Sequence, residues 1–166
     1  MASAKSSRPA CFYDAQHYVM SDSVGYLLVQ VMLNMRRAVE TRMGALGLTD
    51  AQWKPLWLLK LGRVGTAFEL AREMSIDAGA MTRMLDRLET KGLIERTRSE
   101  TDRRVVHLRL TPEGETAAEQ VPHVLAEVNN EYLRGFNKQE WQQLKEFLQR
   151  MLVNGQALQE QPGENA

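Results

Sequence analysis

The sequence contains very little cysteine and histidine. Of its 166 residues, one is a cysteine, Cys11, and three are histidines, His17, His107 and His123. A single cysteine excludes an intrachain disulfide and is typical of a protein in a reducing compartment. The histidines lie far apart and lack metal-ligand spacing, so we expect surface or interface histidines, no metal and no cofactor. A metal site assembled only by folding stays open at this point.

Long apolar runs are also absent. No stretch of about 18 apolar residues occurs, which argues against a membrane-spanning helix. The N-terminal residues lack the apolar core of a secretory signal, so we expect a cytoplasmic protein with no membrane partner. Glycine-rich phosphate loops, Gly-x-Ser-x-Gly and His-Glu-x-x-His motifs are missing as well. The sequence therefore predicts a protein that is not an enzyme.

The net charge is zero, but the two signs are unevenly distributed. Residues 1–62 carry seven Lys and Arg against four Asp and Glu, and residues 63–109 carry ten against eight. Residues 110–166 carry four against nine. The first two thirds of the chain are therefore mildly basic, which is compatible with a surface that binds an anionic partner.

Apolar residues recur at helical spacing through most of the chain. Five stripes are visible, at residues 24–43, 53–61, 81–88, 121–132 and 141–151. Thr49 with Gln52, and Thr66 with Glu69, have the spacing of capping boxes, and each pair predicts the start of a helix. The sequence therefore predicts long helices at both ends and shorter ones between them.

A β-hairpin is predicted after the short helices. Residues 93–110 read as two strands joined by a polar loop, because apolar and polar side chains alternate from residue 105 onward. Thr111 and Pro112 then start the next helix. The fold class we expect is mainly α with a small β-hairpin wing, in which a winged helix-turn-helix lobe is joined to a dimerisation region of terminal helices.

The helix predicted at residues 78–91 has two different faces. Its apolar side consists of Met81, Met84, Leu85 and Leu88. Its polar side consists of Thr82, Arg83, Asp86, Arg87 and Thr90. Small residues at positions 78–80 allow close approach to a phosphate or a base edge. Arginine at 83 and 87 suits a major groove, because its guanidinium can bind O6 and N7 of guanine together. The alternative interpretation is an ordinary solvated helix face.

Arg103 and Arg104 lie in the loop between the two predicted strands. A short basic loop can reach a minor groove, where the negative potential of DNA is concentrated. Asp102 beside them could hold one guanidinium by a charge-assisted hydrogen bond. A polar hairpin tip without function is the alternative, but a doubled arginine directly after a candidate recognition helix favours binding to double-stranded DNA.

The terminal helices carry apolar stripes that a winged lobe cannot cover. Packing between two chains would bury both stripes, so we expect a homodimer with Leu144, Leu148 and Met151 at the interface. The expected division is an arm (1–21), a dimerisation helix (22–48), a DNA-binding lobe (49–111), C-terminal dimerisation helices (112–158) and a tail (159–166).

Residues 70–114 resemble the MarR family of bacterial transcription regulators. The resemblance depends on the Asp-x-Arg pattern of Asp102 and Arg104 and on the Leu-Thr-x-x-Gly helix start from Leu110 to Gly114. It implies an obligate homodimer that binds a palindromic operator, usually as a repressor. It also implies release from DNA by small phenolic or aromatic acids or by oxidation.

The resemblance also implies roles for single residues. Arg104 would enter the minor groove, with Arg103 its neighbour and Asp102 its brace. The residues expected to face the major groove are Thr82, Arg83, Asp86 and Arg87.

Trp53 and Trp57 lie one helical turn apart in the stretch LTDAQWKPLWLL. The resemblance places an aromatic effector between the long helices and the winged lobe, near Trp53. Lys54 could pair with a carboxylate of that effector. The alternative is that both tryptophans belong to the core, as two tryptophans at this spacing usually do.

Two other functions stay open. Some regulators of this family sense oxidants through an N-terminal cysteine near tyrosines, and Cys11 lies near Tyr13. A reactive thiol needs nearby cations or a helix N-terminus, so an inert cysteine is the alternative. A winged domain could also bind only proteins. DNA binding would weaken steeply with salt through counterion release, whereas an apolar protein interface would not.

Overall fold

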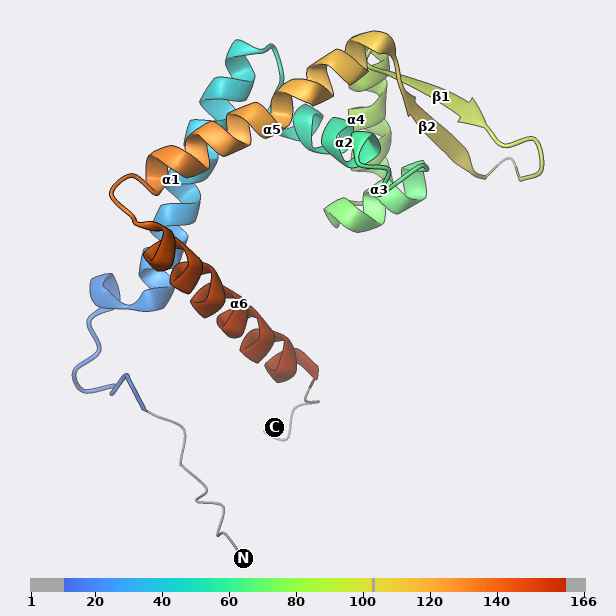
Figure 1. Ribbon diagram of the computed structural model, residues 1–166. Coiled ribbons are helices and arrows are strands. Elements are labelled where there is room, and N and C mark those ends of the chain that lie inside the picture. The colour runs from blue at the N-terminus through green and yellow to red at the C-terminus, as the bar shows by residue number, and fades with distance from the viewer. Residues whose placement is uncertain (1–10, 103, 161–166) are drawn as a thin grey trace, which may run out of the picture.

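The computed structural model describes residues 11–102 and 104–160 of the chain. Arg103, the first ten residues of the expected arm and the last six of the expected tail lie outside the described residues. The elements in chain order are a 3-10 turn η1 (Met20–Asp22), α1 (Val24–Ala45), α2 (Asp50–Lys60), α3 (Ala67–Met74), α4 (Ala78–Thr90), β1 (Ile94–Arg98), β2 (Val106–Leu110), α5 (Pro112–Tyr132) and α6 (Lys138–Glu160) (Figure 1). The expected fold class is confirmed. Within the described residues, no helix is both long and apolar enough to cross a membrane.

Side chains placed just outside the helices define where the helices begin. The Thr66 hydroxyl accepts a hydrogen bond from the Glu69 amide at 3.2 Å, and a Glu69 carboxylate oxygen accepts from the Thr66 amide at 3.0 Å. Asp77 caps α4 by accepting a hydrogen bond from the Ala80 amide at 2.8 Å. Such caps satisfy backbone N–H groups that the first helical turn leaves without partners. They therefore fix the start of α3 and, through Asp77, the turn between α3 and α4.

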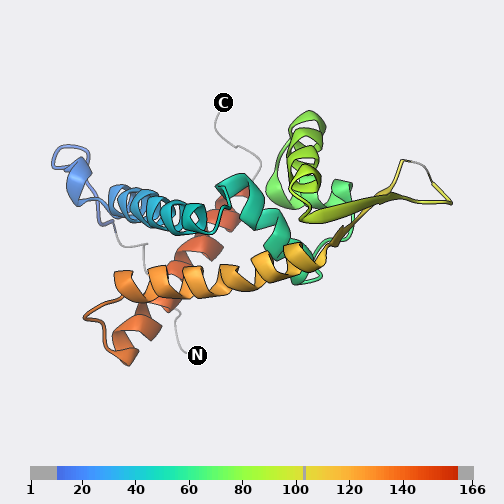
Figure 2. The same cartoon turned by 90° about the horizontal axis from the view of Figure 1, so that it is seen from above.

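The wing is an antiparallel hairpin attached to the start of α3. Ile94 pairs with Leu110, and Arg98 pairs with Val106 at the far end of the ladder. The Leu108 amide also donates to the carbonyl of Gly65 at 2.9 Å, which ties β2 to the loop before α3. The base of the wing is therefore held to the lobe, while its tip extends beyond it (Figures 1 and 2).

The core lies where α4 meets α2, α3, α5 and β1. The buried apolar face of α4 is the one predicted from its spacing, formed by Met81, Met84, Leu85 and Leu88. Fully buried Leu56, Leu70 and Val121 pack into the same cluster from α2, α3 and α5. Burying each such side chain contributes about 1.5–3 kcal/mol. This packing presents the opposite face of α4 to solvent.

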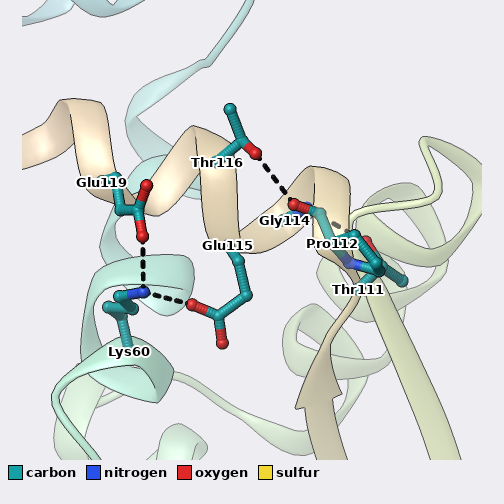
Figure 3. Close-up of polar contacts among 7 residues, drawn as sticks. All are labelled: Lys60, Thr111, Pro112, Gly114, Glu115, Thr116 and Glu119. Carbon is teal, nitrogen blue, oxygen red and sulfur yellow. Dashed lines mark hydrogen bonds and ion pairs between the residues drawn. The ribbon is translucent and has the colours of Figure 1, made fainter.

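The helix α5 leaves the lobe through a tight polar junction (Figure 3). The Thr111 hydroxyl accepts from the Gly114 amide at 3.0 Å and donates to the Gly92 carbonyl at 2.5 Å. Lys60, at the end of α2, contacts the carboxylates of Glu115 and Glu119. These two acidic side chains raise the pKa of the Lys60 ammonium, Glu115 most strongly. Two separate polar contacts thus set the direction of α5.

Helices α1 and α5 lie side by side, whereas α6 leaves them. The two long helices run in opposite directions and are joined by a contact between Arg42 and Glu131 at 2.6 Å (Figure 2). Helix α6 turns away from α5 and lies apart from the lobe (Figure 1). Among the described residues, it shares no extensive contact with another element of the chain. Its apolar side is therefore uncovered within the chain.

We predict that Gly114→Ala strongly destabilises the protein. A Cβ at this position would lie 1.9 Å from the carbonyl oxygen of Leu93, so the backbone of β1 or α5 would have to move. Overpacking of this kind costs roughly 1–3 kcal/mol, which thermal unfolding followed by circular dichroism would detect. The matched control is Gly44→Ala in α1, where a Cβ would meet no atom within 4 Å. Equal melting temperatures for the two variants would contradict the assigned packing.

Candidate nucleic-acid interface and adjoining pocket

The polar face of α4 is exposed as the sequence predicts. Thr82, Arg83, Asp86 and Arg87 are all solvent-accessible, while the opposite side of the helix is buried. The Thr82 hydroxyl donates to the Ala78 carbonyl at 2.9 Å, so part of its hydrogen-bonding capacity is used within the helix. Arg83 and Arg87 make no ion pair within the described residues, and their guanidinium groups are available to an anion.

Asp86 differs from its neighbours because it is paired with the wing. Its carboxylate lies 2.8 Å from a guanidinium nitrogen of Arg96, on β1. The Arg96 Nε also donates to Glu89 at 2.9 Å, and this contact chiefly lowers the pKa of the Glu89 carboxyl. One arginine therefore joins two acidic residues of α4 to the first strand of the wing. Sequence reasoning missed Arg96.

Arg104 lies exposed in the wing loop, as expected. Asp102 does not hold the Arg104 guanidinium, contrary to the expectation. Its carboxylate accepts a hydrogen bond from the Arg104 backbone amide at 2.9 Å, and not from the Arg104 guanidinium. Asp102 thus shapes the turn and leaves that guanidinium available, because a side chain two residues before an amide is well placed to form an Asx-type turn. Arg103 lies outside the described residues.

An open pocket adjoins α4 on the side of α2. Its volume is about 910 Å³, and its lining includes Trp53, Lys54, Trp57, Arg83 and Arg87. The three residues expected at an effector site therefore share one cavity with two of the expected DNA contacts. The location differs from the expectation, because the lining residues that the structure describes come from α2, α3, α4 and the turn before α4, and none of them comes from α1. The cavity is a feature of the lobe itself.

The charge of Lys54 is already compensated within α2. Its ammonium lies 2.7 Å from a carboxylate oxygen of Asp50, and the Trp53 indole N–H donates to the other oxygen at 3.1 Å. Lys54 also lies 5.4 Å from the centre of the Trp53 ring. Asp50 therefore fixes both side chains, and the two arginines of α4 are the better partners for an anionic group in this pocket.

Among the described residues, the remaining sequence candidates do not come together in a site. The Cys11 thiol is exposed and donates to the Tyr13 carbonyl at 3.3 Å, a contact that gives a thiolate no stabilisation. His17 pairs with Asp14 at 2.7 Å on the surface, and His107 and His123 are exposed. In the part of the chain that the structure describes, no group of three acidic, histidine or cysteine side chains could hold a metal ion.

Comparisons with known proteins agree with this geometry. The model of the MarR family matches residues 48–106, which span α2 to the start of β2. The multiple antibiotic resistance protein MarR of Salmonella typhimurium is 38% identical over 97 residues, covering 58% of this chain and 67% of the relative. The protein of the same name from Escherichia coli is 32% identical over 130 residues, covering 78% and 90%.

A solved structure of a DNA complex is also similar. It contains a mutant MarR from Escherichia coli bound to operator DNA, and it shares 32% identity with a TM-score of 0.67. The match covers 78% of this chain and 93% of that chain. With its exposed arginines on α4, its basic wing and its sequence relatives, the chain belongs to the MarR family of DNA-binding transcription regulators.

Proposed function

We propose that this regulator represses transcription by binding a palindromic operator as a homodimer, and that a small aromatic carboxylate or phenolic compound releases it. The main support for the proposal is that Arg83 and Arg87 belong to two surfaces at once. Both lie on the exposed face of α4 and also line the pocket beside Trp53. A ligand in the pocket would act on side chains that DNA also needs.

In the proposed complex α4 lies in the major groove and the wing reaches the adjacent minor groove. Thr82, Arg83 and Arg87 face the base edges, and Arg104 with Arg103 enters the minor groove. The lobe at residues 49–111 is the DNA-binding unit. Asp86 takes a different role from the one first expected, because its pairing with Arg96 holds α4 against β1. The Escherichia coli relative bound to operator DNA supports this docking.

The homodimer follows from apolar surface that the chain does not cover. On α1 the exposed large apolar residues are Val24, Leu27, Leu28, Val29, Val31 and Met32, and on α6 they are Trp141, Phe147, Met151, Leu152, Val153 and Leu158. Leu144 and Leu148 are only partly buried. A patch of this size marks an interaction site. A second copy that presents the same helices would bury it, so residues 22–48 and 112–158 form the proposed dimerisation region.

The proposed effector places its ring against the indoles of α2. Trp53 and Trp57 supply flat apolar faces, and Arg83 or Arg87 binds the carboxylate, since Asp50 already neutralises Lys54. Bound there, the effector competes with DNA for these arginines. It also wedges α4 away from α2, which changes the spacing of two recognition helices that must lie about one DNA turn apart, roughly 34–36 Å.

We predict different losses for two arginine substitutions. Arg104→Ala should weaken binding to the DNA upstream of the protein's own gene and flatten its salt dependence by about one unit of slope, as for a lost phosphate-type contact. Arg83→Ala should relax discrimination at one base position by ~1–3 kcal/mol. Fluorescence anisotropy over a range of salt concentrations measures both effects. Unchanged affinity and slope in both variants would exclude this docking, and wild-type binding that ignores salt would favour a protein-interaction module.

We predict that Leu152→Glu dissociates the dimer. This side chain is 67% exposed in the single chain, so a charge there should not disturb the monomer's own core. In the dimer the carboxylate would be buried among apolar residues, at a large desolvation cost. Analytical ultracentrifugation should show twice the 18.9 kDa of one chain for the wild type and a monomer or aggregates for the variant. Gln143→Glu, on the opposite side of α6, is the control and should remain dimeric.

We predict that benzoate quenches tryptophan fluorescence and lowers DNA affinity, and that Trp53→Ala removes both responses while DNA binding persists. Coupling through lobe spacing alone should lower the affinity about 5–150-fold, or ~1–3 kcal/mol, and competition for the arginines adds to this loss. Lys54→Ala should still respond, because Asp50 holds its charge. Trp141→Phe, in α6, is the control for an indole outside the pocket. A full response by Trp53→Ala would place the effector outside this pocket.

A further inference from the structure

One aromatic side chain of the winged lobe is left in solvent. Phe68, in the first turn of α3, is 76% exposed, while Leu61 at the end of α2 is 49% exposed. A single exposed apolar residue is ordinary on a protein surface. The surroundings of Phe68 distinguish it, because it lies beside the wing that carries Arg104.

Phe68 lines a groove between α3 and the loop end of the wing, where β2 begins. Apolar atoms of Val105 and Val106 form the wing side, and the groove has a volume of about 430 Å³. Two guanidinium groups line it, from Arg72 and Arg104, and both residues are exposed. Arg72 follows Phe68 by four residues, so the two side chains share one face of α3. The groove therefore combines an apolar surface with two cations.

Glu69, the acidic residue of the groove, directs its carboxylate toward backbone amides and forms no ion pair with the two arginines. The carboxylate of Glu69 accepts hydrogen bonds from the backbone amides of Gly65 at 2.8 Å and Thr66 at 3.0 Å. The Gly65 contact is the main cause of the lowered pKa of Glu69. Its negative charge is thus directed at the N-terminus of α3, where it offsets the positive end of the helix dipole. The charge of Arg72 also contributes to the lowered pKa of Glu69, as the smallest cause, but neither Arg72 nor Arg104 forms an ion pair within the described residues, so both can attract an external anion.

We propose that this groove binds the sugar-phosphate backbone of the operator strand between the wing and α4. Phe68 packs against a deoxyribose, and Arg72 with Arg104 binds the phosphates on either side of it. The occupant follows from two observations. The groove shares Arg104 with the DNA-binding surface, and the first helix of a helix-turn-helix crosses the DNA backbone when the second lies in the major groove.

The chemistry of a DNA backbone matches this arrangement. An apolar sugar ring alternates with an anionic phosphate along each strand, and the groove offers an apolar ring, that of Phe68, together with two arginines. Contacts of this kind fix the register of the protein on the duplex and carry no sequence information. The inference rests on the proposed docking of α4 and the wing, and it adds α3 as a third contact.

The test compares full-length variants on two duplexes of equal length, one from the DNA upstream of the protein's own gene and one of mixed sequence. Arg72→Gln should weaken binding to both and reduce the salt slope by about one, since one counterion fewer is released. Arg72→Lys should keep the slope. Phe68→Ala should weaken binding to both duplexes roughly three- to tenfold without changing the slope, because an uncharged contact releases no counterion. Leu61→Ala is the control for an exposed apolar residue of the lobe outside the groove.

Two results would overturn the inference. In one, Phe68→Ala and Arg72→Gln bind both duplexes with wild-type affinity and slope while Arg83→Ala and Arg104→Ala show their expected losses. The groove assignment then fails and the proposed docking stands, whereas normal binding by all four variants would reject the docking itself. In the other, Phe68→Ala changes the sedimentation of the DNA-free protein, which would identify a second copy of the chain as the occupant.

Discussion

The contact between the first turn of α5 and the carbonyl of Leu93 determines how the lobe is held relative to the long helices α1 and α5. Gly114 allows this approach because a Cβ there would lie 1.9 Å from that oxygen. Thr111 binds Gly92 across the same junction, one residue before Leu93 and two before the start of β1. The end of α4, the wing and α5 therefore meet at one point. In the proposed dimer a rigid junction matters, because small changes in direction there would be amplified at the two recognition helices.

Overall neutrality is compatible with DNA binding because the acidic side chains of the lobe are used internally. Arg96 engages Asp86 and Glu89. Asp77 and Glu69 cap the N-termini of α4 and α3, and backbone hydrogen bonds, from Ala80 and Gly65 in the first place, lower the pKa of each. These carboxylates stay ionised, but their charge is directed toward protein groups. The exposed arginines of α4 and the wing therefore dominate the local potential, which the sum over the whole chain conceals.

The helices and the family could be predicted from the sequence because their signals are local. The capping box of Thr66 and Glu69 and the apolar spacing of α4 each lie within a few residues. The prediction that the protein is not an enzyme agrees with its membership of a family of transcription regulators. The pairing of Asp86 with Arg96 could not be predicted, because it depends on how β1 packs on α4. The pocket depends on the same tertiary packing. The ion pair of Asp50 with Lys54 could have been predicted, because Asp50 precedes Lys54 by four residues and this spacing favours an ion pair on a helix.

The proposed effector has two routes to release the protein from DNA, lobe spacing and competition for the shared arginines, and the two differ in their thermodynamics. Coupling through the spacing of the lobes is limited by the difference in effector affinity between two conformations, so the loss of DNA affinity reaches a plateau at high effector concentration. Competition for Arg83 and Arg87 has no such plateau. The apparent free energy of DNA binding then keeps changing by RT ln(1 + [L]/Kd) as effector is added. Because the pocket wall and the DNA-facing side of α4 share these two side chains, the competitive contribution is built into the proposed site, and lobe spacing can only add to it.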